Sequence, residues 1–115
     1  RIERDDTLMA RTRRVYTCHP YANEQPDANI RLREICCELV AEGLSPVCPQ
    51  VLLAHFLHEH EEREAGLYVR QQLLKDCDEM RVYGREITPT MRIEIAFAET
   101  IGLPIRYVDS AAEIA

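Results

Sequence analysis

Short extended runs alternate with longer amphipathic segments along this chain, and that alternation limits its fold more than any other feature. Runs of four or five residues bounded by proline or glycine predict strands, and apolar residues at three-to-four spacing predict helices. The order strand, helix, strand, helix, strand, helix, strand requires a parallel sheet with right-handed crossovers and helices on both faces. The predicted strands are 14–18, 45–49, 80–83 and 104–108, and the predicted helices are 27–43, a turn or two within 51–57, 61–77 and 88–101.

Local signals set the ends of two of these helices. Asp27 is the expected N-cap of the first long helix, and Gly43 closes it. Thr88 and the proline that follows it supply an N-cap and an N1 proline for the last helix.

Length and charge narrow the class of protein. A chain of 115 residues fits one domain, so we expect a charged N-terminal arm over 1–13 and a single α/β domain over 14–115. Lys and Arg number 14 against 20 Asp and Glu, which gives a net charge of −6 and argues against binding to a nucleic-acid polymer. The four glycines are too far apart for a glycine-rich phosphate loop.

The cysteines and the lengths of the apolar runs indicate in which compartment the protein works and whether a metal or a membrane is involved. Five cysteines without a C-x-x-C pair suggest neither a disulfide framework nor a zinc ribbon, so a reducing cytoplasm is expected. No apolar run approaches the roughly 18 residues of a membrane span, so no membrane partner is expected. We expect no metal and no other cofactor.

The loops that follow the predicted strands hold the candidate site residues, because ligands of parallel α/β sheets bind outside the carboxyl ends of the strands. These residues are His19, Tyr21, Asn29, Pro49, Gln50, His55, Arg85, Thr88, Thr90, Glu94 and Asp109.

Glu94 follows the helix-initiating Pro89 by five residues, at about the end of the first helical turn. A carboxylate there could enter the crevice and attack or stabilise an electron-poor carbon, as in glycosyl transfer. The alternative is a solvated glutamate that complements the helix dipole. Spacing leaves both interpretations open.

Histidines and cysteines allow further chemistry. His19 follows a strand, where an imidazole could meet a substrate or have only a structural role. His55, His58 and His60 do not share one helical face, which favours a solvated polar face over a metal site. The cysteines are expected mostly as buried small apolar residues.

Tyrosines offer rings that could stack on a base. Tyr16 and Tyr83 lie on predicted strands, so we expect them in the core, whereas Tyr21 lies in a loop and is expected to contact a ligand.

Several segments, taken in order, resemble the nucleoside 2-deoxyribosyltransferase-like superfamily, most closely its small branch of unknown function that is common in phages and bacterial mobile elements. The similarity spans about 14–108. It implies a Rossmann-like or flavodoxin-like parallel sheet of about four to five strands, a homo-oligomer, and a pocket for a nucleoside or nucleotide. The segments are Tyr16-Thr-Cys-His-Pro-Tyr21, Asn29, Pro46 to Pro49, Cys77-Asp78, Thr90-Met-Arg-Ile-Glu94 and Gly102-Leu-Pro104.

The resemblance also assigns roles. It implies that Glu94 is a nucleophile that attacks the anomeric carbon of a nucleoside and expels the base. Family members usually carry small residues just before this glutamate, and some true transferases carry acids at the positions of Thr88 and Arg70. Here those residues are absent. His19 replaces a serine and is expected to supply a proton instead. The substrate-binding residues implied are Tyr16, Pro20, Tyr21, Asn29, Gly84, Thr88, Thr90 and Met91.

These observations leave three hypotheses. The first is a deoxyribosyltransferase or N-glycoside hydrolase that uses Glu94. The second is a non-catalytic module that binds a nucleotide-like metabolite, since two expected carboxylates are missing. The third is a structural subunit whose helix stripe around Gly66 and Val69 makes an oligomer.

Overall fold

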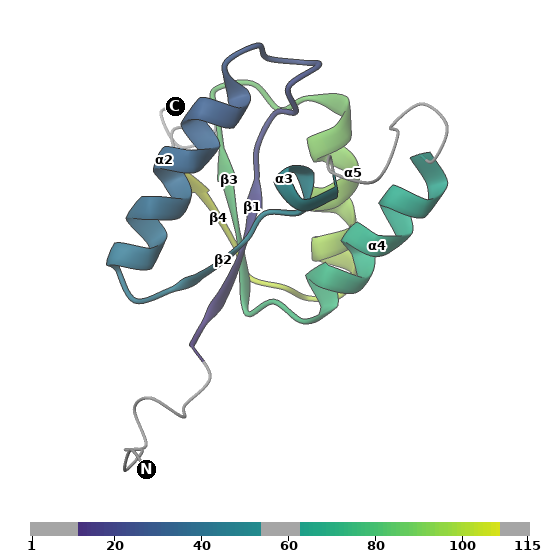
Figure 1. Ribbon diagram of the computed structural model, residues 1–115. Coiled ribbons are helices and arrows are strands. Elements are labelled where there is room, and N and C mark those ends of the chain that lie inside the picture. The colour runs from purple at the N-terminus through teal and green to yellow at the C-terminus, as the bar shows by residue number, and fades with distance from the viewer. Residues whose placement is uncertain (1–11, 54–62, 109–115) are drawn as a thin grey trace.

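The computed structural model describes residues 12–53 and 63–108, which form a four-stranded parallel sheet with helices on both faces (Figure 1). The α/β architecture expected from the sequence is confirmed. Residues 1–11, His55, His58, His60 and Asp109 lie outside the described residues, so the expectations for them stay predictions. The elements are β1 (Arg14–Cys18), α2 (Ala28–Ala41), β2 (Ser45–Val47), α3 (Pro49–Leu53), α4 (Arg63–Lys75), β3 (Glu79–Tyr83), α5 (Pro89–Thr100) and β4 (Ile105–Val108).

The structure contains one of the two predicted N-caps and lacks the side-chain hydrogen bond of the other. At α5 the prediction is confirmed, because the Thr88 hydroxyl accepts a hydrogen bond of 3.3 Å from the backbone N–H of Met91 and proline occupies the first turn. At α2 the side chain of Asp27 makes no capping bond and instead accepts a hydrogen bond from the Gln25 amide. Gly43 does close α2, with a positive φ of 82°.

Some boundaries also differ from the prediction. β2 ends at Val47, because Pro49 begins the short helix α3 instead of closing the strand. Glu79 joins β3, and Pro104 stays outside β4. The second long helix, described from Arg63, ends at Lys75, two residues before its predicted end.

Strand alternation divides the core between the two faces of the sheet. Tyr16, Cys18, Met80 and Val82 face α4 and α5, which bury a cluster against them. Val15 packs on the other face against α2. Figure 1 shows α2 on one side of the sheet and α3, α4 and α5 on the other. Each fully buried side chain contributes roughly 1.5 to 3 kcal/mol, so both faces stabilise the fold.

Strand order places a crevice at one position along the sheet. The order β2-β1-β3-β4 means that the chain moves from β1 to one side and then crosses to the other, so the order reverses between β1 and β3. In parallel α/β sheets this reversal leaves a crevice outside the carboxyl ends of the two strands. Here those ends are Cys18 and Tyr83.

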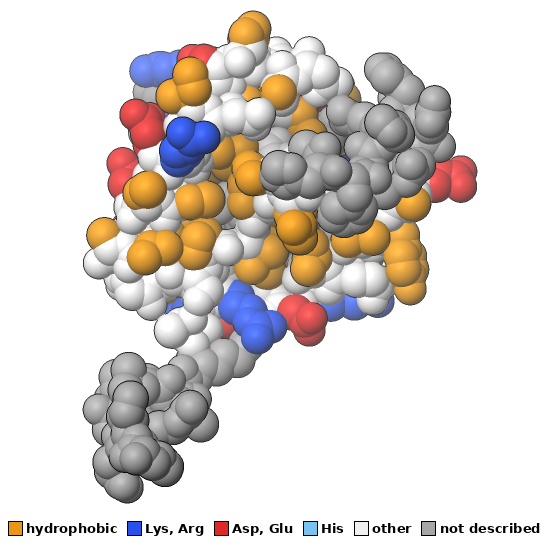
Figure 2. All heavy atoms as spheres, in the orientation of Figure 1, with side chains coloured by type: hydrophobic (Ala, Val, Ile, Leu, Met, Phe, Trp, Pro, Cys, Tyr) orange, Lys and Arg blue, Asp and Glu red, His pale blue; other side chains and the backbone are white. Residues whose placement is uncertain are grey.

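Apolar side chains also remain exposed over α2, α3 and α4 on the face seen in Figure 2. Exposed apolar area of this kind often marks a contact surface. The homo-oligomer stays a prediction. The largest such side chains on these helices are Ile30, Val40, Val51, Leu52 and Tyr68.

Candidate functional site: a buried carboxylate and a separate histidine cavity

Glu94 is the sixth residue of α5 and is only 2% exposed. It therefore lies in the second turn of the helix, slightly later than expected. It shares the buried face of α5 with Met91, Ile95 and Ala98, all packed on the sheet. The solvated-glutamate interpretation is wrong for this reason. An ionised carboxylate so deep in a protein needs hydrogen bonds or a counter-ion to offset its lost hydration.

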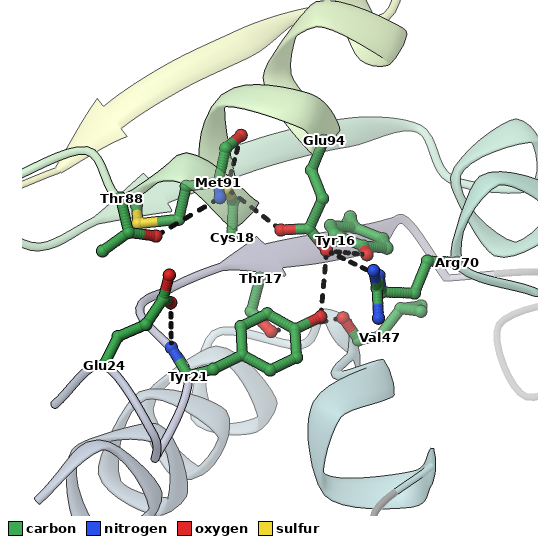
Figure 3. A network of polar contacts seen from close by, with 10 residues as sticks. All are labelled: Tyr16, Thr17, Cys18, Tyr21, Glu24, Val47, Arg70, Thr88, Met91 and Glu94. Atoms are coloured by element: carbon green, nitrogen blue, oxygen red, sulfur yellow. Dashed lines mark hydrogen bonds and ion pairs between the residues drawn. The ribbon is translucent and has the colours of Figure 1, made fainter. Parts of the chain in front are cut away.

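Glu94 has both kinds of partner (Figure 3). The Tyr16 hydroxyl donates a 2.5 Å hydrogen bond to Oε2, and the Tyr21 hydroxyl donates one of 3.2 Å to the same oxygen. The Cys18 thiol donates to Oε1 over 3.5 Å. Arg70 on α4 places Nε 3.6 Å from Oε2, which is an ion pair longer than a hydrogen bond. β1, the loop after it and α4 therefore converge on one carboxylate.

Burial is the largest influence on the titration of this centre. It raises the pKa of Glu94 above its ordinary value, while the Tyr16 hydrogen bond and the Arg70 charge act in the opposite direction. Burial and the Glu94 charge raise the pKa values of Tyr16 and Tyr21, so both phenols stay protonated and donate. Burial likewise raises the pKa of Cys18, which keeps the thiol neutral and a poor nucleophile.

Arg70 is the partner that the sequence did not assign to Glu94. Its guanidinium carbon lies 5.4 Å from the centroid of the Tyr21 ring, within the range of a cation–π contact. Its side chain is 12% exposed, and its buried Nε has no hydrogen-bond acceptor. One signal was available in the sequence. Arg70 stands midway between Gly66 and Leu74 at four-residue spacing, and both of these are buried.

Gln50 is a second polar side chain for which the described residues supply no hydrogen-bond partner. It lies in α3, which contacts α4, and it is 9% exposed. Its amide nitrogen and its amide oxygen are both buried without a hydrogen bond. Buried amides in folded proteins are almost always satisfied, so Gln50 is available to a partner outside the described residues, such as a water molecule or a ligand.

His19 occupies a different environment. It is 2% exposed, and its Nδ1 lies 2.8 Å from the backbone oxygen of Pro20. A carbonyl can only accept, so Nδ1 carries the proton and Nε2 of the neutral ring is an acceptor. Burial lowers the pKa of His19, which favours this neutral form. The side chain lines a cavity of about 500 Å³ together with Gln25, Asp27, Ile30, Arg31, Glu34, Tyr83, Gly84, Arg85 and Glu86.

The structure does not bring His19 and Glu94 together. Cys18 and His19 are consecutive at the end of β1, and successive residues of a strand point to opposite faces. The Cys18 thiol accordingly contacts Glu94 on the α5 side, whereas His19 turns to the cavity beside α2. A proton delivered by His19 to a reaction at Glu94 has no support in this geometry.

The other predicted substrate-binding residues are divided between these regions. Thr90 is half-buried in the first turn of α5. Gly84 has a positive φ of 104°, and a side chain there would stand 3.4 Å from the Pro20 ring. Asn29 is exposed on α2. Tyr16 and Tyr21 donate hydrogen bonds to Glu94, Met91 shares the buried face of α5 with it, and Thr88 caps this helix.

These features define a small parallel α/β domain with a buried, hydrogen-bonded carboxylate beside the carboxyl end of its first strand. The chain belongs to the family described as a domain of unknown function (DUF7768), whose model matches residues 13–108. Among curated proteins, none matches the sequence.

Two further findings concern metals and membranes. Within 12–53 and 63–108, no group of three or more His, Cys, Asp or Glu side chains is arranged to hold a metal ion. None of the helices in these same ranges is both long and apolar enough to cross a lipid bilayer.

Proposed function

We propose that the protein binds a nucleoside or nucleotide and cleaves or transfers its N-glycosidic bond through Glu94. The observation that carries the proposal is the Glu94 carboxylate, buried and oriented by two phenols next to the end of β1. The resemblance of the motif order to the nucleoside 2-deoxyribosyltransferase-like superfamily supports the same conclusion.

The two oxygens of Glu94 are not equivalent, and this suggests which one reacts. Oε2 receives both phenolic hydrogen bonds and the ion pair with Arg70, whereas among the described residues Oε1 receives only the weak thiol donor of Cys18. Oε1 therefore keeps more of its lone-pair density and is the better nucleophile. The tyrosines fix the plane of the carboxylate, so that Oε1 points the same way in each turnover.

The proposed reaction consists of two successive displacements at the anomeric carbon. Oε1 bonds to the anomeric carbon as the carbon–nitrogen bond breaks, and the electron pair leaves with the base, which then takes a proton from water. Water or a second base next attacks the same carbon and releases the carboxylate. Two inversions give net retention at that carbon.

The test uses purified protein with deoxynucleosides, ribonucleosides and their monophosphates, with and without a second free base, followed by chromatography. Glu94→Gln keeps the shape but removes the nucleophile. Glu99→Gln is the matched control, because Glu99 is an exposed glutamate on the same helix. We expect base release or exchange with the parent and Glu99→Gln, and none with Glu94→Gln. Equal turnover by Glu94→Gln would overturn the proposal.

A specific observation favours the second candidate, a non-catalytic binding module. The groups around Glu94 are two tyrosines and a cysteine with raised pKa values and an arginine, so none is a ready proton donor for a leaving base. Such a module would be stabilised by its ligand, by about 2.7 kcal/mol at 100 times the dissociation constant, without forming product. A nucleotide panel without any thermal shift would contradict it.

A further inference from the structure

Arg70 has donors that the described part of the chain leaves unused. A guanidinium carries five N–H groups in a planar fork and has no acceptor. The anion at Arg70 is Glu94, which lies 3.6 Å from Nε, and Nε itself makes no hydrogen bond. The Tyr21 ring, 5.4 Å away, lies against this guanidinium. Beyond its ion pair with Glu94, Arg70 therefore has N–H groups for which the described residues supply no acceptor.

Gln50 adds an independent observation on the same face of the sheet. Both of its amide atoms are buried without a partner, in the helix that packs on α4 (Figure 1). An amide offers donors on its nitrogen and an acceptor on its oxygen. A ligand that satisfies Gln50 as well as Arg70 needs acceptors together with at least one donor.

The charges here favour a neutral ligand group over an anion. Among the described contacts of Glu94, the only cation is Arg70. A phosphate would add up to two negative charges beside a buried carboxylate that already has this one counter-ion. A neutral group with acceptor atoms satisfies the guanidinium without that repulsion and without the desolvation of a further charge.

We propose that Arg70 makes the site selective for 6-oxopurine nucleosides, an inference that rests on the proposed function. O6 and N7 of a 6-oxopurine are adjacent acceptors that match the guanidinium fork. A 6-aminopurine presents an N–H donor in place of O6, which opposes the arginine. The N1–H of the 6-oxopurine donates, and the amide oxygen of Gln50 can accept such a hydrogen bond.

The same contact assists departure of the base. When the bond between the anomeric carbon and N9 breaks, its electron pair moves onto the base and spreads to O6 and N7. The Arg70 hydrogen bonds strengthen as this charge develops. The base takes its proton from water afterwards. Arg70 therefore contributes more to kcat than to KM.

The experiment measures kcat and KM for deoxyinosine, deoxyguanosine, deoxyadenosine and deoxyinosine monophosphate. For the parent we expect kcat/KM at least about tenfold higher with deoxyinosine than with deoxyadenosine. Arg70→Gln should lose this preference, mainly through kcat. Arg33→Gln should keep it, since Arg33 is an exposed arginine on α2, on the other side of the sheet.

A second variant separates base recognition from a simple counter-ion role. Arg70→Lys keeps the charge beside Glu94 but loses the planar fork. We expect it to retain the pH profile of the parent while losing the preference for 6-oxopurines. Unchanged preference in Arg70→Lys and Arg70→Gln would overturn the inference, as would a preference for the monophosphate that Arg70→Gln abolishes.

Failure of this inference and failure of the proposed function give different results. Equal cleavage of deoxyinosine and deoxyadenosine overturns the selectivity but leaves the glycosidic chemistry intact. If no nucleoside is cleaved, the proposed chemistry fails, and isothermal titration with the same two nucleosides tests Arg70 alone. Similar dissociation constants, or no binding to either nucleoside, would then overturn the inference.

Discussion

The Glu94 centre and the His19 cavity begin at two consecutive residues at the end of β1, but they lie on opposite faces of the sheet and have different hydrogen-bond partners. Cys18 leads to a closed carboxylate centre on the side of α4 and α5, and His19 leads to a cavity of about 500 Å³ beside α2. In the first, protein donors contact the carboxylate, whereas in the second the described residues supply no hydrogen bond to the imidazole Nε2. Two residues that are adjacent in sequence at the end of a strand therefore contribute to sites on opposite faces of the sheet.

Burial shifts the pKa values of Glu94 and His19 in opposite directions. It raises the pKa of Glu94 and lowers the pKa of His19, because in each case it disfavours the charged form. Glu94 retains a counter-ion and three donors that favour its ionised form, whereas His19 is held in one neutral tautomer by the Pro20 carbonyl. The two centres are therefore suited to different chemistry.

The largest expected difference between the centres is in activity. Glu94→Gln should reduce base release by about 10³-fold or more, since it removes the attacking group. His19→Gln should reduce it by less than about tenfold, because His19 faces the cavity beside α2, away from Glu94. Steady-state rates with the best nucleoside check both values. A loss in His19→Gln as large as in Glu94→Gln would remove the distinction between the two centres.

The next effect is on stability. Tyr16→Phe removes the shortest hydrogen bond to Glu94 and leaves the buried carboxylate less satisfied, so we expect a loss of about 1 to 3 kcal/mol in the free energy of unfolding. Tyr83→Phe, on the α2 face, should cost less than about 1 kcal/mol. Urea unfolding of both variants and the parent measures the difference. Equal losses would show that the Tyr16 hydrogen bond contributes nothing particular to the Glu94 centre.

The pH dependence of stability should also have opposite signs at the two centres. The folded-state pKa of Glu94 is raised, so its contribution is complete below its unfolded value near 4.5 and is lost as pH rises through the folded value. The folded-state pKa of His19 is lowered, so its contribution is complete above 6.5 and is lost as pH falls through the folded value.

Unfolding free energies between pH 4 and 8 test these signs. Glu94→Gln should flatten the decline on the alkaline side, and His19→Gln should flatten the rise from the acidic side. A parent whose stability increases with pH through the Glu94 titration would contradict the raised pKa.

The smallest effect concerns the two helices that border these centres. Thr88→Ala removes the side-chain cap of α5 and should cost about 1 kcal/mol in unfolding free energy. Asp27→Ala should cost no more than about 0.5 kcal/mol, because Asp27 makes no capping bond at α2. Thermal or urea unfolding measures both. A larger loss at Asp27 than at Thr88 would reverse the assignment of the caps.

The sequence by itself determined the order of elements, the parallel sheet, the cap of α5 and the location of Glu94 early in the helix that follows the third strand. These follow from local causes, namely strand and helix periodicity, the fixed φ of proline and the hydroxyl of Thr88. Such causes act over a few residues, so they can be recognised in one chain without knowledge of its packing.

Only the tertiary structure decided that Glu94 is buried, that Arg70 is its counter-ion and that His19 faces away from it. Arg70 and Glu94 lie on different helices, and their contact depends on how α4 and α5 rotate as they pack on the sheet. Tyr16 and Tyr21 reach the same carboxylate only because α5 lies across β1. Contacts of this kind arise from packing between distant segments, which local periodicity does not specify.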